Sequence, residues 1–201
     1  MDTKSNTTTL ATYQEYFSNY LAGTATVASG FQERWLASLL KGLPTSANVL
    51  EIGSATGRDA AYMRDLGYDV QTSDAIDAAL RELKRKGFSP IRLNVITDEI
   101  DGEYDLILAS AVFLHFTEME LRIVLEKLRS HIAQEGRLAF SVKQGMGDEW
   151  SVHKMSAPRY FKYWQPDTLA SLLHEYDYVI KDMRITEDNK WLHFMCGMKE
   201  R

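Results

Sequence analysis

Short apolar or β-branched runs alternate with segments of helical periodicity from Asn48 onward, and this alternation is the strongest constraint on the fold. Five runs predict strands, at 48–52, 69–73, 90–94, 104–110 and 136–142. Helical patterns lie between several of them, at 58–66, 76–86 and 118–133. A helix that connects two neighbouring strands makes those strands parallel. The order therefore predicts an α/β fold, a mostly parallel, doubly wound sheet with helices on both faces.

The two ends of the chain extend this pattern differently. Before residue 45, helical spacing relates Tyr13, Tyr16, Phe17 and Tyr20, and a second helical pattern covers 31–43. Near the C-terminus a helix is predicted over 165–176, followed by strand-like runs at 177–185 and 191–198. The turn-like "TEDN" between these runs predicts a hairpin, and hence one antiparallel strand in the sheet.

Length and composition favour one domain that covers residues 1–201, with 45% hydrophobic residues. We expect a helical cap at 1–44, a ligand-binding core at 45–145, and a substrate-side segment, helix and hairpin at 146–201. No run approaches the about 20 apolar residues of a membrane span, and no signal peptide is recognisable, so a cytoplasmic protein without a membrane partner is expected. The single cysteine, Cys196, agrees with a reducing compartment. The net charge of -5 argues against a nucleic-acid partner.

The stretch "VLEIGSATGRDA" (49–60) joins the first predicted strand to a helix through a loop of small residues. The loop has neither the G-x-G-x-x-G pattern of dinucleotide sites nor the lysine of a P-loop. Gly53 and Gly57 still permit close approach of a ligand to the backbone. A ligand with a carboxylate and an amine fits best, because the helix N-terminus favours the carboxylate and Glu51 supplies negative charge for an ammonium group.

A second acid, Asp74, ends the second predicted strand 21 residues after Gly53. A carboxylate at this place accepts hydrogen bonds from ribose hydroxyls in nucleotide-binding α/β folds. A ligand with both an amino-acid end and a ribose is S-adenosylmethionine or its demethylated product. No metal site is expected.

At these motifs the chain resembles the class I S-adenosylmethionine-dependent methyltransferases. The matching stretches are "EIGSATG", "QTSDAID", "RLNV", "YDLILASAVFLHF" and "HIAQEGRLAFSVK". The resemblance implies a single Rossmann-like sheet of strand order 3-2-1-4-5-7-6, with the seventh strand antiparallel. It departs from the family at Ala55, where a glycine is common, and at Asn94, where an aspartate is common. The implied cofactor-binding residues are Glu51, Gly53, Ser54, Ala55, Gly57, Asp74, Ala75, Asn94, Val95 and Ser110.

Acceptor binding is expected to involve parts outside this common core. His115, after the fourth strand, is the candidate general base, with the alternative that it only shapes the pocket. The segment 143–166 is expected to be an irregular loop over the site, unless "RYFKYW" forms a short strand. Arg159 either offers its planar fork of donors to an acidic acceptor or is an exposed strand residue. The candidate substrate-binding residues are Tyr16, Tyr20, His115, Lys143, Arg159 and Tyr160.

The sequence therefore predicts a methyltransferase, monomeric or homodimeric, that uses S-adenosylmethionine to methylate oxygen or nitrogen of a small-molecule acceptor. Three other functions stay open from the sequence: a nucleic-acid methyltransferase, a protein methyltransferase, and a non-catalytic partner subunit that binds the cofactor. The net negative charge argues against a nucleic-acid methyltransferase.

Overall fold

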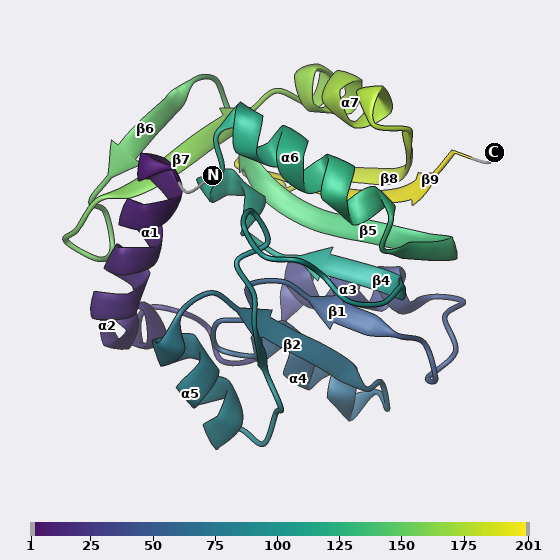
Figure 1. Cartoon of the computed structure of the whole chain (residues 1–201), viewed down its shortest axis with the longest axis horizontal. Coiled ribbons are helices and arrows are strands. Elements are labelled where there is room, and N and C mark those ends of the chain that lie inside the picture. Colours follow the sequence, from purple (N-terminus) through teal and green to yellow (C-terminus); the bar gives the residue numbers. More distant parts are fainter. Residues whose placement is uncertain (1–2, 200–201) are drawn as a thin grey trace.

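The computed structural model describes residues 3–199 and contains one nine-stranded sheet with helices on both faces (Figure 1). The strands are β1 Val49–Glu51, β2 Val70–Asp74, β3 Ile91–Arg92, β4 Tyr104–Ala109, β5 Ile132–Gln144, β6 Asp148–Ser151, β7 Arg159–Trp164, β8 Tyr178–Ile185 and β9 Trp191–Met198. The first five are parallel and lie in the order β3-β2-β1-β4-β5.

Beyond β5 the sheet divides into two branches. In one branch β9 pairs antiparallel with β5 over Leu138–Lys143, and β8 pairs with the outer side of β9. Counting only the seven strands predicted from the sequence, β8 is the sixth and β9 the seventh, so this branch confirms the predicted order 3-2-1-4-5-7-6.

The second branch corrects the prediction for residues 143–166, which were expected to form mainly an irregular loop. β7 pairs parallel with the last two residues of β5, and β6 pairs antiparallel with β7. The alternative interpretation of "RYFKYW" as a strand is thus the one the structure shows. Two strands, β6 and β9, thus run in the direction opposite to all the other strands, where one was expected.

The helix predicted over 118–133 ends earlier than expected. Sheet pairing already includes Ile132, which lies opposite Tyr104 of β4, and the Tyr104 N–H donates to the carbonyl of His131. The last four residues of the expected segment therefore leave the helix for a turn and for β5. A capping box between Thr117 and Glu120 fixes the other end of this helix.

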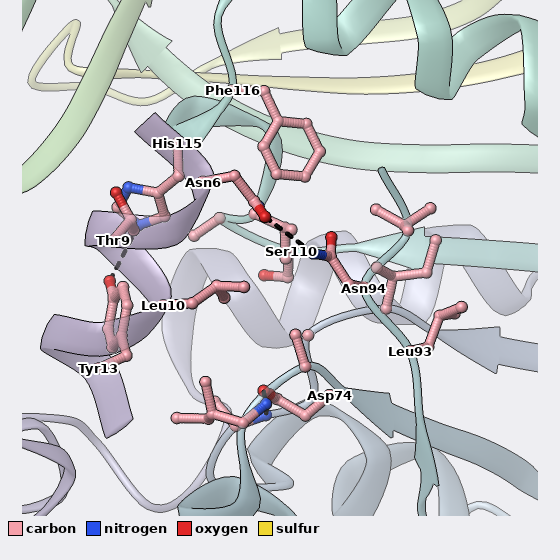
Figure 2. Close-up of a pocket in the computed structure, with 18 of the residues that line it drawn as sticks. Asn6, Thr9, Leu10, Tyr13, Asp74, Leu93, Asn94, Ser110, His115 and Phe116 are labelled. Atoms are coloured by element: carbon pink, nitrogen blue, oxygen red, sulfur yellow. Dashed lines mark hydrogen bonds between the residues drawn. The ribbon is translucent and has the colours of Figure 1, made fainter. Parts of the chain in front are cut away.

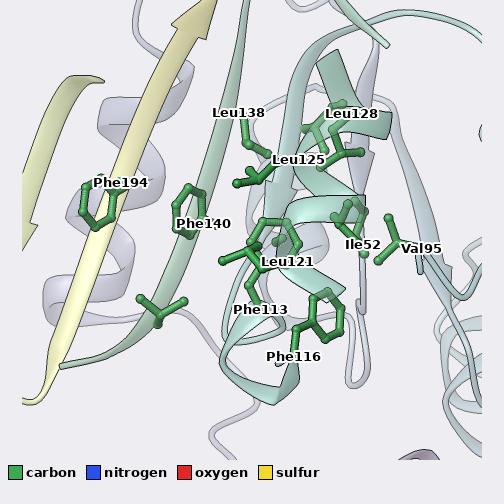
Figure 3. Packing of buried hydrophobic residues seen from close by; sticks show 14 of the residues in the cluster. Ile52, Val95, Phe113, Phe116, Leu121, Leu125, Leu128, Leu138, Phe140 and Phe194 are labelled. Atoms are coloured by element: carbon green, nitrogen blue, oxygen red, sulfur yellow. The ribbon is translucent and has the colours of Figure 1, made fainter. Parts of the chain in front are cut away.

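The helices pack on the sheet as two layers (Figure 1). They are α1 Lys4–Glu15, α2 Phe17–Ala22, α3 Gly30–Leu40, α4 Arg58–Asp65, α5 Asp77–Arg85, α6 Glu118–Arg129 and α7 Pro166–Glu175, with a 3-10 turn, η1, at Phe113–His115. One apolar cluster joins α6 and α7 to one face of the sheet, and its aromatic centre includes Phe113, Phe140 and Phe194 (Figure 3). A second cluster joins α3 and α4 to the other face.

The N-terminal tyrosine stripe does not lie on one continuous helix. Tyr16 has φ -103° and ψ 24°, which ends α1 and begins α2. As a result Tyr13, Phe17 and Tyr20 turn toward the sheet, while Tyr16 does not. Between residues 3 and 199 we find no helix with the length and apolar character needed to span a membrane.

Candidate functional site

A pocket lies between the N-terminal helices and the edge of the sheet where β1, β2 and β4 end (Figure 2). Its empty volume is about 790 Å³ when the open mouth is included. The helices contribute six lining residues, Asn6, Thr9, Leu10, Tyr13, Phe17 and Tyr20. The opposite wall comes from the loops that follow the strands, as expected for ligand sites in open α/β sheets.

The glycine loop after β1 contributes Gly53 and Ala55 to this wall of the pocket. Gly53 has φ +67°, and a Cβ atom placed there would lie 2.6 Å from Cγ2 of Val112. The position therefore requires glycine for two separate reasons, a left-handed backbone and the closeness of a neighbouring side chain. Ala55, which stands where the family often has glycine, also lies in the left-handed region, with φ +47°.

Asp74 is held rigidly at the end of β2. Its Oδ2 accepts the Ala55 N–H at 2.9 Å, and its Oδ1 accepts the Ile76 N–H at 3.1 Å. Burial raises the pKa of this carboxyl to about 6, although the backbone hydrogen bonds act to lower it. A carboxylate has about four lone-pair sites, so Asp74, which lines the pocket, has acceptor capacity left for a diol.

Asn94 connects the strand side of the pocket to α1. Its Nδ2 donates to Oδ1 of Asn6 at 2.8 Å, and its Oδ1 accepts the Ile96 N–H at 3.2 Å (Figure 2). If Asn94 binds the cofactor, as the resemblance implies, its carbonyl oxygen is thus shared with a backbone donor. Val95 is buried beside it and lines the same part of the pocket.

His115 and Tyr13 meet at the corner of the pocket between η1 and α1 (Figure 2). Nδ1 of His115 lies 2.7 Å from the carbonyl oxygen of Tyr160, so this nitrogen carries the proton, and Nε2 accepts the Tyr13 hydroxyl at 2.9 Å. The Tyr13 oxygen in turn accepts Nη1 of Arg159 at 2.9 Å. Burial, with a smaller effect from the cations Arg159 and Lys143, lowers the pKa of His115 to about 3.

An acidic cluster lies under the glycine loop. Oε2 of Glu51 is buried and has no hydrogen-bond partner, and burial together with the nearby Asp59 raises the pKa of Glu51 to about 8. Asp59 itself is satisfied, because Arg58 and Gln32 both donate to its carboxylate. Gln32 also donates to the Ser110 hydroxyl at 3.2 Å, which links this cluster to the pocket wall.

The structure brings most of the predicted site residues together, but not all of them. Those that line the pocket are Gly53, Ala55, Asp74, Ala75, Asn94, Val95, Ser110, Tyr20 and His115. Those that lie outside its lining are Glu51, Ser54, Gly57, Tyr16, Lys143, Arg159 and Tyr160. Ser54 and Gly57 shape the loop through their backbone hydrogen bonds, and Tyr160 holds His115 through its carbonyl. Arg159 is not an exposed strand residue, since only 5% of it is accessible.

The sequence predicts a helical cap at 1–44, but it did not identify three residues of the first helix that line the pocket. Asn6, Thr9 and Leu10 line the pocket, and the signal that could have found them is a polar stripe at helical spacing. The buried residues of α1 are all polar: Ser5, Asn6, Thr9 and Thr12. Tyr13 was noticed only as part of the tyrosine stripe, yet it makes the corner with His115.

Comparisons with known proteins agree with this geometry. A family model described as "Methyltransferase domain" matches residues 24–182, while a search of curated proteins finds no match. Among solved structures, a "DhpI-SAM-HEP complex" superposes with a TM-score of 0.80 at 16% identity, covering 98% of this chain and 99% of that one. The CcbJ methyltransferase from Streptomyces caelestis gives 0.74 at 14% identity, covering 94% and 98%.

A third structure is the 1,6-didemethyltoxoflavin-N1-methyltransferase of Burkholderia thailandensis, solved with 1,6-didemethyltoxoflavin and S-adenosylhomocysteine. Its TM-score is 0.73 at 19% identity, and the match covers 94% of this chain and 88% of that one. At such identities these likenesses establish a shared fold.

Proposed function

This chain belongs to the methyltransferase-domain family, and on that premise we propose that it transfers the methyl group of S-adenosylmethionine to nitrogen or oxygen of a small molecule. The observation that carries the proposal is Asp74, a buried carboxylate fixed by two backbone N–H groups directly beside the glycine loop. That arrangement suits a ribose, and a ribose beside an open glycine loop suits a cofactor of this class.

The donor and acceptor groups of the pocket fit the three parts of the cofactor. Asp74 would accept the ribose hydroxyls, and Asn94 with Val95 would hold the adenine. Gly53 and Ala55, which line the pocket with little or no side chain, would allow the amino-acid part to approach the backbone. Glu51, whose buried Oε2 has no partner, supplies negative charge behind that loop. When bound, the cofactor supplies an electrophilic methyl group.

The chain's own contribution is to hold the acceptor in line and to exclude water, which can supply most of the acceleration in such a displacement. His115 is poorly suited to be the base, because burial disfavours its protonated form and its Nε2 already accepts the Tyr13 hydroxyl. We infer that His115 is a positioning residue. It orients Tyr13, which lines the pocket.

A small acceptor is favoured over a macromolecule. The helices α1 and α2 lie across the pocket beside the β6–β7 pair (Figure 1), so a large acceptor would have to displace them. Among the structural neighbours, one is described as acting on 1,6-didemethyltoxoflavin, which agrees with an acceptor of this size. The net charge of -5 argues against a nucleic-acid acceptor.

Calorimetry with S-adenosylhomocysteine tests the cofactor part of the proposal. Asp74→Ala should weaken binding by about 2–3 kcal/mol, because two charge-assisted hydrogen bonds are lost and water recovers part of their free energy. Asp101→Ala, at an exposed loop position, is the matched control and should bind as the unmodified protein does. Unchanged affinity in a folded Asp74→Ala variant would remove Asp74 from the site.

A second experiment tests the acceptor class. The protein is incubated with methyl-labelled cofactor and an extract of the source organism, and the products are separated by size. Label in the small-molecule fraction supports the proposal. Label on protein or nucleic acid would establish one of the other acceptor classes, and label in no fraction would favour a non-catalytic partner subunit.

A further inference from the structure

We propose that the acceptor is an oxyanion, bound at the corner of Tyr13 and His115, with its charge met by Arg159 behind Tyr13 and by Lys143 across the Phe161 ring. This inference rests on the proposed function and names the substrate class of the same site. It follows from a buried arginine and a partly exposed lysine, neither of which has a carboxylate partner.

Arg159 is the main observation. Its side chain is only 5% exposed, and its three nitrogens meet no carboxylate. Nη1 donates to the Tyr13 hydroxyl at 2.9 Å, Nη2 donates to the carbonyl of His153 at 2.6 Å, and the buried Nε has no partner. A buried guanidinium that is met only by neutral acceptors is costly, and an opposite charge would offset much of that cost.

Lys143 approaches the same place from the end of β5. Its Nζ lies 5.2 Å from the centre of the Phe161 ring, and Cζ of Arg159 lies 5.0 Å from the centre of that ring. Tyr163 and Trp191 complete an aromatic surround of Lys143, each with its ring centre 5.9 Å from Nζ. The His115 ring packs edge-on against Phe161 at 4.7 Å, so both cations and His115 contact one aromatic residue.

The ion pairs of residues 3–199 include neither Arg159 nor Lys143. The chain does not lack acids, since it carries 28 acidic residues against 23 basic ones. Arg58, at the start of α4, is by contrast paired with Asp59 at 2.6 Å. The excess of positive charge is therefore local to the corner and is not a property of the whole surface.

A third cation, Lys154, adds to this local charge. Its Nζ donates to the Thr24 hydroxyl at 3.0 Å and lies 4.9 Å from the centre of the Tyr20 ring, which lines the pocket. Its pKa is lowered, first by burial and then by the positive charges of Arg159 and Arg58. The pKa of His115 is lowered in the same way by Arg159 and Lys143, after burial.

Tyr13 connects these cations to the pocket. Its hydroxyl faces the lining, accepts from Arg159 and donates to His115. An oxyanion at the corner would accept this hydroxyl proton in place of Nε2 of His115 and gain the charge of the guanidinium behind it. A neutral acceptor would gain much less, because it could use the hydroxyl but would leave both cations without a counter-ion. The geometry suits a carboxylate and a phosphonate alike.

The test uses the full-length protein saturated with S-adenosylhomocysteine and three probes of one shape: benzoate, phenylphosphonate and the neutral benzamide. Calorimetry should show at least one anion binding with a Kd below about 5 mM, and benzamide binding tenfold or more weakly. Arg159→Gln and Lys143→Gln should each weaken the anion tenfold or more and leave benzamide unchanged. Arg137→Gln is the matched control, since Arg137 donates only to the carbonyls of Leu39 and Lys41.

Each outcome decides the proposal. Preference for benzoate or for phenylphosphonate identifies the oxyanion class. Equal binding of benzamide and the anions, or no anion binding at all, overturns it, as does an unchanged anion affinity in both variants. S-adenosylhomocysteine binding is measured first in every protein, so failure of the proposed function is seen separately. If Arg159→Gln does not fold, the partly exposed Lys143→Gln variant carries the test.

Discussion

The two walls of the pocket are built by different chemistry. The core wall consists of the loops after β1, β2 and β4 with Asn94 and Val95, and it presents backbone N–H groups, small residues and the fixed carboxylate of Asp74. The cap wall consists of the six lining side chains of α1 and α2. The core wall lies within the residues that match the family, whereas the cap wall precedes them.

The cap is attached by polar contacts and by one small apolar cluster, in which Phe17 packs against Ile76 and Ala79. Asn6 bonds to Asn94, Thr9 accepts the N–H of Tyr160, and Thr12 donates to the carbonyl of Pro158. A typical hydrogen bond contributes only about 1 kcal/mol net. The strands behind the core wall are held instead by large apolar clusters on both faces of the sheet. Opening of the cap should therefore cost less free energy than unfolding of the core wall.

The largest expected effect is on the core wall. Gly53→Ala should destabilise the protein by about 3 kcal/mol, because the new Cβ combines a left-handed φ with a contact of 2.6 Å to Val112. Urea unfolding measures it. Gly102→Ala is the control: Gly102 also has a positive φ, +82°, but nothing lies within 4 Å of its Cβ position, so only about 1 kcal/mol is expected.

The contact term can be isolated further. Adding Val112→Ala to Gly53→Ala removes the Cγ2 atom that the new methyl group meets. The free energy of unfolding of the double variant should then fall by no more than the cost of a left-handed alanine plus the cost of the small cavity at Val112. The coupling energy between the two substitutions should therefore be favourable. Equal losses of unfolding free energy in Gly53→Ala and Gly102→Ala would show that the contact with Val112 adds nothing to the cost of the left-handed backbone.

A second effect on the core wall depends on pH. Burial raises the pKa of Glu51 from 4.5 to about 8 in the folded protein, so the folded state binds this proton more tightly than the unfolded state. The stabilisation that the folded state gains from binding the Glu51 proton is therefore fully present below pH 4.5 and is lost as pH rises through 8. Glu51→Gln cannot ionise, so relative to the unmodified protein it should gain about 1–3 kcal/mol between pH 5 and pH 9.

Unfolding curves at several pH values check this gain. Glu99→Gln, at an exposed position, is the control and should run parallel to the unmodified protein. Asp74, whose pKa is raised to about 6, titrates in both proteins and cancels in the comparison. A difference between Glu51→Gln and the unmodified protein that does not change with pH would show that Glu51 is already compensated.

The cap wall should respond more weakly and more locally. Tyr13→Phe removes the hydroxyl that bonds to both Arg159 and His115, which leaves two enclosed polar groups without a partner, and should cost about 1–2 kcal/mol. Hydrogen exchange should show the loss of protection in α1, while the amides of β4 keep theirs. Tyr16→Phe, at the break between α1 and α2, is the control. Equal loss of protection in β4 would mean that cap and core unfold as one unit.

The same division explains what the sequence could predict. The strand order was implied by the family resemblance, and the position of Asp74 follows from local patterns, an apolar run that ends in an acid and a glycine loop at fixed spacing. The position of the cap depends on side-chain pairs far apart in the chain, such as Asn6 with Asn94, which no local pattern encodes. β6 escaped prediction because "DEWS" is polar and exposed and becomes a strand only by pairing with β7.

The smallest expected effect distinguishes backbone strain from ligand contact within the core wall. Ala55 has φ +47°, a left-handed conformation that costs an alanine about 1 kcal/mol, whereas glycine adopts it freely. Ala55→Gly should therefore stabilise the protein by up to about 0.5 kcal/mol, since the greater entropy of glycine in the unfolded chain offsets part of the relief. Ala75→Gly, at a lining residue without a positive φ, should instead destabilise it by about 0.5–1 kcal/mol.

The difference between these two variants measures the strain at residue 55, and ligand binding then shows whether that strain serves the site. The Ala55 N–H donates to Asp74 whatever its side chain, so Ala55→Gly should bind S-adenosylhomocysteine as the unmodified protein does. A tighter complex would mean that the alanine methyl crowds the cofactor. A weaker one would mean that alanine pre-organises the loop, so that the core wall, like the cap wall, depends on a side chain for its shape.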